Sequence, residues 1–204
     1  MVRLPRLYAI LDSSCFPRSG TLLAAAKALS TAGVTLLQYR NKSGNAREIL
    51  QGAQQLRRTL GSSVRLIMDD RADLALAADC DGVHVGQDDL SAEGARIVIG
   101  PKLWLGVSTH NPAQVGEAEQ TSADYLAVGP VFATASKANP DPVIGLEGIR
   151  RARALTRKPL VAIGGITRRN CRSALDAGAD SVAVISDLVR EPRKSAEEFL
   201  RILG

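Results

Sequence analysis

The stretch PLVAIGGITRRNCRSALDAGADSVAVIS, residues 159–186, joins two short apolar runs through an amphipathic segment. The runs Pro159–Gly164 and Ser181–Ser186 are nearly continuous in aliphatic residues, as is typical of strands that are covered on both faces. Between them, Arg168–Ala177 has helical periodicity, and Gly178 stands where a helix would end before the next strand. Residues 159–186 therefore predict a strand, a helix and a second strand that is parallel to the first.

The same alternation runs through the whole chain. Eight strands are predicted, at Leu7–Leu11, Thr35–Arg40, Arg65–Asp70, Gly82–Gly86, Leu103–Thr109, Asp124–Gly129, Pro159–Gly164 and Ser181–Ser186. Helical periodicity lies between them, most clearly at Thr21–Ala32, Ala46–Leu60, Pro112–Thr121 and Arg168–Ala177. The 204 residues allow about twenty-five per unit, enough for a closed barrel with short loops. We therefore expect an α/β fold with one TIM barrel, (β/α)8, as a single domain over residues 1–204.

An open, doubly wound sheet is the alternative fold. It is disfavoured because no GxGxxG motif follows the first strand. Polar motifs also follow many of the strands, whereas an open sheet would concentrate them at one switch point.

Composition narrows the classes of partner. The chain has 26 Lys and Arg against 21 Asp and Glu, a net charge of +5, but the basic residues are scattered and only 3% of residues are aromatic. This pattern favours small anionic ligands over nucleic acid. No run of eighteen apolar residues is present, which argues against a membrane partner. The sequence is also compatible with a homo-oligomer.

The cysteines and the start of the sequence bear on the compartment. The three cysteines form no CxxC pair, and only two histidines could complete a metal set, which argues against structural zinc and disulfides. Met1–Tyr8 lacks the pattern of a secretory signal. We expect a reduced, cytoplasmic environment.

Cationic and amide side chains follow the second predicted strand. Alternation along a strand places Gln38 and Arg40 on the same side, and Lys42 follows as the chain leaves the strand. In a TIM barrel the carboxyl ends of the strands carry the chemistry, so these three side chains would converge on an anion. Solvated charges at a loop are the alternative interpretation.

Acidic residues end the next two strands. Asp69 and Asp70 follow the third strand, and Asp89 follows the fourth. Neighbouring strands lie about 4.8 Å apart, so these carboxylates can approach one hard cation, and few carboxylates with room for water and phosphate describe a Mg²⁺ site. Helix capping is the alternative, by Asp69 or Asp70 after the third strand and by Asp89 or Ser91 after the fourth. We interpret His84, inside the fourth strand, as a structural histidine with satisfied hydrogen bonds.

Hydroxyls and glycines follow the later strands. Gly164-Gly165 allows a turn whose N–H groups face an anion, and barrels often bind phosphate after strands seven and eight. The loop 134–142 brings Thr134, Ser136 and Lys137 together, and we interpret it as a candidate lid or substrate loop. Two anion sites at one rim suggest two phosphorylated ligands.

Read together, these segments resemble the thiamine-phosphate synthase family. The matching segments are Leu7–Ile10, Gln38–Lys42, Asp69–Ala75, Gly82–Asp89, Gly129–Phe132, Thr134–Lys137 and Ile163–Ile166. The resemblance implies a Mg²⁺-dependent transferase that joins 4-amino-2-methyl-5-(diphosphooxymethyl)pyrimidine to a thiazole phosphate, giving thiamine phosphate and pyrophosphate.

The resemblance also implies roles for individual residues. Mg²⁺ would be held by Asp70 and Asp89, and the catalytic set would be Arg40, Lys42, Ser108 and Lys137. The pyrimidine diphosphate would be held by Gln38, Tyr39, Arg40, Asn41, Lys42, Asp69, Ser108 and Lys137. The thiazole phosphate would be held by Thr134, Ala135, Ser136, Gly165, Ile185 and Ser186. The family usually has Asn where this chain has Asp69, and Thr where it has Ser136.

Two other functions are weighed against the transferase. A related thiazole tautomerase would use the same fold for proton transfer. An isomerase has little use for residues that would bind a Mg²⁺-diphosphate, and Arg40, Lys42 and Asp70 are such residues. A catalytically inert phosphate-binding or regulatory barrel is the other alternative, and Asp69 is the main clue in its favour.

Overall fold

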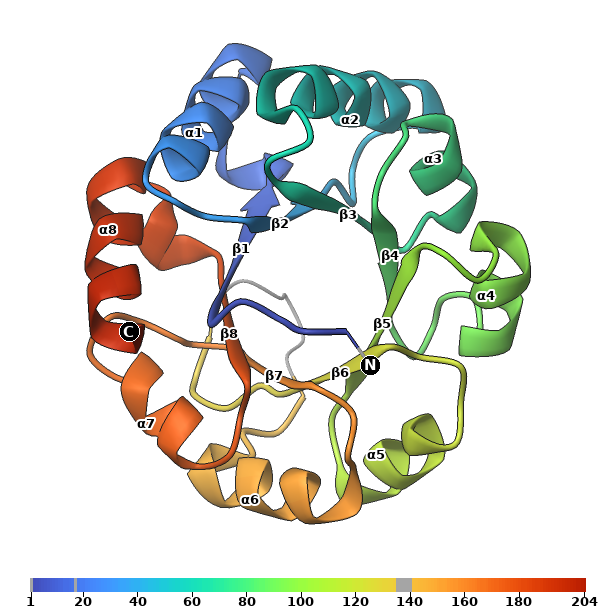
Figure 1. Cartoon of the computed structure of the whole chain (residues 1–204), viewed down its shortest axis with the longest axis vertical. Helices are drawn as coiled ribbons and strands as arrows, with labels where there is room; N and C mark the ends of the chain where they lie inside the picture. Colours follow the sequence, from blue (N-terminus) through green and yellow to red (C-terminus); the bar gives the residue numbers. More distant parts are fainter. Residues whose placement is uncertain (1, 17, 135–140) are drawn as a thin grey trace.

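The computed structural model describes residues 2–16, 18–134 and 141–204. In this part of the chain eight parallel strands close into a barrel in the order β1 to β8, with helices around the outside (Figure 1). This confirms the predicted (β/α)8 barrel. The strands are β1 (Leu7–Asp12), β2 (Leu36–Arg40), β3 (Arg65–Asp69), β4 (Gly82–Val85), β5 (Trp104–Thr109), β6 (Tyr125–Val128), β7 (Leu160–Ile163) and β8 (Ser181–Val184).

One α-helix follows each strand, and short 3₁₀ helices follow the first and last strands. The α-helices are α1 (Ser19–Thr31), α2 (Ala46–Leu60), α3 (Ala72–Ala77), α4 (Ala92–Ile99), α5 (Pro112–Glu119), α6 (Gly145–Leu155), α7 (Cys171–Asp176) and α8 (Pro192–Leu203). The 3₁₀ helices are η1 (Ser13–Cys15) and η2 (Ser186–Leu188). Side-chain caps explain several starts: Asn45 and Glu48 form a capping box at α2, and Asn111 caps α5 before Pro112.

Most predicted strand and helix boundaries differ from the structure by one or two residues, and two differences have a clear local reason. β3 ends one residue early because Asp70 has a left-handed backbone, with φ of 60°. α7 begins at Cys171 and not at Arg168, because Thr167 N–H donates to the Asn170 side chain at 2.7 Å and holds the preceding residues in a turn.

The apolar residues form two layers. One lies between the strands and the helices and is built mainly from Leu, Val and Ala, which fits the low aromatic content. The other fills the inside of the barrel and contains Tyr8 and Tyr125. Val2 and Leu4 belong to this inner group, so the N-terminal segment covers the end of the barrel opposite the carboxyl ends of the strands.

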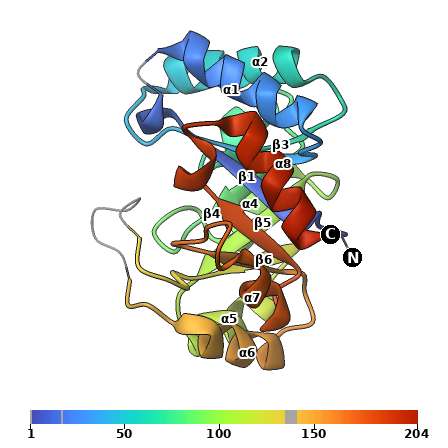
Figure 2. The ribbon, with the colours of Figure 1, turned by 90° about the vertical axis from the view of Figure 1, so that its left-hand side faces the viewer.

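Both chain ends lie at that same end of the barrel (Figure 2). The part of the chain that the structure describes contains no helix long and apolar enough to cross a membrane.

Three similar ion-pair clusters, which we call Arg–Asp clamps, hold the amino ends of the strands. In each, an Arg in the last turn of an even-numbered helix pairs with an Asp just before an even-numbered strand, and the same Asp accepts from a backbone N–H of the preceding strand. The clamps are Arg57–Asp81–Leu66, Arg96–Asp124–Leu105 and Arg153–Asp180–Leu160. Each clamp therefore ties one helix to two strands.

The clamp at Asp124 should contribute measurably to stability. Asp124 Oδ2 accepts from Arg96 at 2.7 Å and from Leu105 N–H at 2.8 Å, so Asp124→Ala removes both bonds and leaves the buried Leu105 N–H unpaired, whereas Arg96 keeps its bonds to backbone carbonyl oxygens. We expect the free energy of unfolding in urea to fall by about 2 to 3 kcal/mol. The control is Asp176→Ala, which removes only an exposed pair with Arg172 and should cost no more than about 0.5 kcal/mol. Equal losses in the two variants would contradict the clamp.

Candidate active site

A cavity of about 520 Å³ opens at the carboxyl ends of the strands. Residues from all eight strands line it, together with residues of the loops that come after them. The barrel thus brings together side chains that are as far apart in the sequence as Gln38 and Ser186. We call this end of the barrel the mouth.

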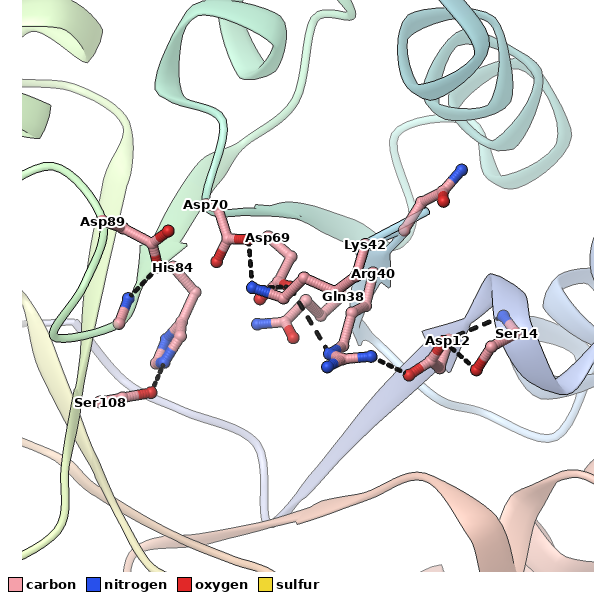
Figure 3. Close-up of polar contacts among 12 residues, drawn as sticks. Asp12, Ser14, Gln38, Arg40, Lys42, Asp69, Asp70, His84, Asp89 and Ser108 are labelled. Carbon is pink, nitrogen blue, oxygen red and sulfur yellow. Dashed lines mark hydrogen bonds and ion pairs between the residues drawn. The ribbon is translucent and has the colours of Figure 1, made fainter. Parts of the chain in front are cut away.

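Alternating acids and bases line one wall of the mouth (Figure 3). Arg40 pairs with Asp12, and its Nε lies 3.7 Å from Asp69 Oδ2. Lys42 Nζ lies 3.5 Å from the same Asp69 oxygen and donates to Asp70. The predicted convergence of Arg40 and Lys42 on one side of β2 is therefore present, with carboxylates from β1 and the end of β3 as their partners.

Asp12 was not predicted from the sequence. It is buried at the end of β1, where it accepts from Ser14 N–H at 3.0 Å and Ser14 Oγ at 2.7 Å while also binding Arg40. These bonds fix the carboxylate, which in turn orients the guanidinium toward the mouth. Asp12 could have been found in the sequence by the position that pointed to Asp69 and Asp70, because it also stands at the carboxyl end of a predicted strand.

Asp69 lies in an unusual electrostatic setting. Burial, together with the nearby Asp70 carboxylate, raises the pKa of Asp69 to about 7, although Lys42 and Arg40 act in the opposite direction. Its Oδ2 is buried and has no hydrogen-bond partner in the part of the chain that the structure describes. A buried oxygen without a hydrogen-bond partner at the edge of a cavity is suited to a ligand or a cation.

Asp70 and Asp89 lie beside each other at the mouth, in the loops that follow β3 and β4. Burial raises the pKa of Asp70, and a hydrogen bond with Asp89 raises it further, against the influence of Lys42. Asp89 Oδ2 accepts from Gly86 N–H at 2.8 Å, whereas Ser91 caps α4. Asp89 is thus directed to the mouth and not to the helix that follows it.

This pair of carboxylates fits Mg²⁺. Two carboxylates close enough to share a hydrogen bond would be stabilised by a shared cation, and the buried Asp69 oxygen that has no hydrogen-bond partner adds a hard donor nearby. Within the described ranges there is no group of three or more His, Cys, Asp or Glu side chains placed to hold a metal. Mg²⁺ is commonly bound by one or two carboxylates with substrate phosphates and water, so the set suits an ion that arrives with its substrate.

His84 lies at the floor of the cavity with both ring nitrogens bonded. Nδ1 lies 3.2 Å from Tyr125 OH and Nε2 lies 2.8 Å from Ser108 Oγ, as expected for a satisfied structural histidine. The ring also lines the cavity, which the sequence did not indicate. Burial lowers the pKa of His84 to about 4, so the imidazole is neutral near pH 7.

The buried imidazole predicts a specific loss of stability in acid. His84 has an ordinary pKa of 6.5 when unfolded and about 4 when folded, so below pH 6.5 only the unfolded chain takes up this proton. The folded state should therefore lose up to about 3 kcal/mol from this residue as the pH falls from 6.5 to 4. His84→Gln removes the titration, so its free energy of unfolding should fall less over that range. Parallel pH profiles for the two proteins would contradict the prediction.

Glycines and hydroxyls form the opposite wall. Gly164 and Gly165 have φ of 94° and 64°, and a Cβ on Gly165 would lie 2.4 Å from the Ala133 carbonyl oxygen. Only glycine fits there, so the backbone of this turn lies open to the cavity. Ile185, Ser186 and Thr134 also line the cavity, so the predicted phosphate residues within the described ranges do lie together.

Two predicted binding residues are placed differently. Tyr39 alternates away from Gln38 and Arg40, and its ring is buried between β2 and α2, where a Cβ on Gly52 would lie 2.3 Å from its hydroxyl. Asn41 donates to Tyr39 OH at 3.1 Å and accepts from Gly44 N–H. Neither lines the cavity, so the structure does not bring these two side chains to the site.

Part of the predicted site lies outside the described residues. Ala135, Ser136 and Lys137 fall there, as does most of the predicted substrate loop 134–142. The structure adds Gln87, His110 and Gln114 to the lining of the cavity. Gln87 donates to the Ser108 carbonyl oxygen at 2.6 Å, and the motif around Asp89 already contained it.

Comparison with known proteins agrees with this geometry. A family model described as thiamine monophosphate synthase matches residues 7–188. A thiamine-phosphate synthase from Koribacter versatilis is 62% identical over 205 residues, covering 99% of this chain and 97% of its own length. One from Chloroflexus aurantiacus is 45% identical over 185 residues, covering 90% of this chain and 85% of its own.

A solved structure supports the same relationship. The thiamine phosphate pyrophosphorylase from Pyrococcus furiosus has 37% identity and a TM-score of 0.85, covering 97% of this chain and 95% of its own. The match to the family model and the identity to these relatives extend over nearly the whole barrel and its mouth. On this evidence the chain belongs to the thiamine monophosphate synthase family, which acts in thiamine biosynthesis.

Proposed function

We propose that this enzyme condenses 4-amino-2-methyl-5-(diphosphooxymethyl)pyrimidine with a thiazole phosphate, releasing pyrophosphate and forming thiamine phosphate. The observation that carries the proposal is the division of one cavity into two unlike walls. One wall has cations and paired carboxylates, and the other has open backbone and hydroxyls. Such a cavity suits two phosphorylated substrates that bind side by side.

The diphosphate belongs on the charged wall. Arg40 and Lys42 point there and would pair with its oxygens, and Asp70 and Asp89 would hold Mg²⁺ beside it. Mg²⁺, when bound, supplies a Lewis acid that stabilises negative charge on the leaving group. By the family resemblance Lys137 would add a further cation, and Gln38 and Ser108 would position the pyrimidine.

The thiazole phosphate belongs on the opposite wall. The turn at Gly164 and Gly165 exposes backbone to the cavity, and Ser186 and Thr134 offer hydroxyls. By the family resemblance Ser136 would supply another. This arrangement leaves the thiazole ring facing the pyrimidine across the cavity.

The reaction then needs no protein nucleophile. The bond between the pyrimidine methylene carbon and the diphosphate oxygen breaks, and its electron pair leaves with the diphosphate. The lone pair of the thiazole nitrogen forms the new bond to the methylene carbon. Arg40 and Lys42 stabilise the charge that develops on the diphosphate, and the cavity holds the two rings in line.

Purified protein with both substrates and Mg²⁺ provides the test. We expect pyrophosphate and thiamine phosphate to appear in equal amounts, and neither to appear when the thiazole phosphate is omitted. If the protein instead interconverts isomers of a thiazole carboxylate without releasing pyrophosphate, it is a tautomerase and the proposal is wrong. Phosphate binding without either reaction would indicate an inert barrel.

A further inference from the structure

A continuous row of hydrogen bonds crosses the floor of the cavity from β2 to β5. Gln38 Nε2 donates to Tyr8 OH at 3.1 Å, and Tyr8 OH lies 3.0 Å from Tyr125 OH. Tyr125 OH lies 3.2 Å from His84 Nδ1, and His84 Nε2 lies 2.8 Å from Ser108 Oγ. Both terminal members line the cavity, whereas Tyr125 is fully buried and does not line it.

The row has only one consistent order of donors once Gln38 donates. A hydroxyl has a single hydrogen, so Tyr8 accepts from Gln38 and donates to Tyr125, which donates to His84 Nδ1. The imidazole must then carry its proton on Nε2 and donate to Ser108 Oγ. Among the residues that the structure describes, no acceptor is found for the Ser108 hydroxyl hydrogen, which is left for a ligand in the cavity.

The barrel is shaped to admit this row. Gly106 on β5 lies beside its centre, and a Cβ there would lie 2.3 Å from His84 Nδ1 and 2.4 Å from Tyr125 OH. The rings of Tyr8 and Tyr125 pack edge to face with centroids 6.1 Å apart, which fixes both hydroxyls. Tyr8, Tyr125 and His84 are buried, and each is hydrogen-bonded on both sides. The direction of donation at the Gln38 end therefore fixes the direction of donation at the Ser108 end.

We propose that Tyr8, Tyr125 and His84 are positioning residues that fix the Ser108 hydroxyl as a hydrogen-bond donor toward the substrate and couple it to the Gln38 amide. We call the five residues Gln38, Tyr8, Tyr125, His84 and Ser108 the floor relay. The inference rests on the proposed function for the identity of the ligand, whose aminopyrimidine ring nitrogens are acceptors. The floor relay would select a ring that offers an acceptor to Ser108 and reject one that offers a donor there.

The order of donors can be measured without any reaction. The chain has only two histidines, so nitrogen-15 spectra of the imidazoles resolve His84 in the intact protein. We expect a neutral ring with the proton on Nε2, and a mixture of the two neutral tautomers in Tyr125→Phe, where Nδ1 has lost its donor. A proton on Nδ1 in the unmodified protein, or an unchanged tautomer in Tyr125→Phe, would overturn the inference.

A double-mutant cycle tests the coupling in catalysis. Tyr125→Phe should raise KM for the pyrimidine diphosphate about tenfold, because the Ser108 hydroxyl is then no longer held as a donor toward the substrate. In the Ser108→Ala background the same substitution should change KM less than about twofold, because its effect passes through Ser108. Equal effects in the two backgrounds would show that Tyr125 acts only on the general structure and would overturn the coupling.

Thr109→Val is the matched control. It removes the buried hydroxyl of the next residue of β5, whose Oγ1 donates to the Ala127 carbonyl oxygen at 2.9 Å outside the floor relay. Its KM should not change, and a tenfold rise would count against the floor relay. If no condensation occurs with any variant, the proposed function fails while the tautomer measurement still decides the hydrogen-bond order.

Discussion

Asp70→Asn and Asp89→Asn should each lower kcat on the order of 10³-fold while the protein stays folded. The two carboxylates lie close enough to share a hydrogen bond, and each would give Mg²⁺ an anionic oxygen that an amide cannot replace. Removing one charge weakens the ion at the point where diphosphate charge develops. Initial rates across a Mg²⁺ titration at saturating substrates measure the loss, and we expect the Mg²⁺ concentration for half activity to rise as well.

The control for these variants lies one turn away. Asp73→Asn changes an exposed carboxylate that pairs with Arg71 at the start of α3, outside the cavity. It should have ordinary activity and an ordinary Mg²⁺ dependence. If Asp70→Asn or Asp89→Asn also shows unchanged turnover, that residue does not hold the metal.

Lys42→Met should lower kcat on the order of 10²-fold with a smaller change in KM. The Lys42 ammonium group reaches Asp70 and lies 3.5 Å from Asp69, so it stands where the leaving diphosphate would lie. Negative charge grows on the leaving diphosphate oxygen as its bond to the methylene carbon breaks. The ammonium group therefore stabilises the transition state more than it stabilises the bound substrate. Met keeps most of the side-chain length without the charge, and steady-state kinetics for each substrate measure the effect.

Two further variants make this result specific. Lys42→Arg should recover part of the rate because it restores the positive charge with a different shape. Lys27→Met removes an exposed lysine on α1 and should leave kcat unchanged. A rise in KM alone in Lys42→Met would show that the lysine only holds the substrate.

The barrel and the positions at its mouth could be predicted from the sequence because both depend on local patterns. Apolar strands that alternate with amphipathic helices predict a closed parallel sheet, and Gln38, Arg40 and Asp70 stand where strands end. The structure places the Tyr39 side chain outside the cavity, although Tyr39 was predicted as a binding residue together with its neighbours in one contiguous motif. Strand alternation, which already linked Gln38 to Arg40, sends the residue between them to the helix layer.

The pairings across the barrel could not be predicted. Tyr8 and Tyr125 look like ordinary core residues in their strands, and only closure of the barrel brings these side chains from β1 and β6 together across its interior. The role of Asp12 could not be predicted for the same reason, because that role is to orient the guanidinium group of Arg40 on the next strand. Such contacts depend on register and on three-dimensional distance, which hydrophobic periodicity does not carry.

The Arg–Asp clamps also divide the barrel into four quarters, each made of one even-numbered helix and the next two strands, and these quarters should differ in how easily they unfold locally. Three quarters have a clamp, but in the quarter made by α8, β1 and β2 the residue just before β2 is Thr35, and the closest counterpart is Arg6 donating to the Leu203 carbonyl oxygen. This is also the seam where the two ends of the chain meet. Amide hydrogens of β1 and β2 should therefore exchange with solvent sooner than those of β5 and β6. Local unfolding of the barrel would then begin where its first and last elements pack together.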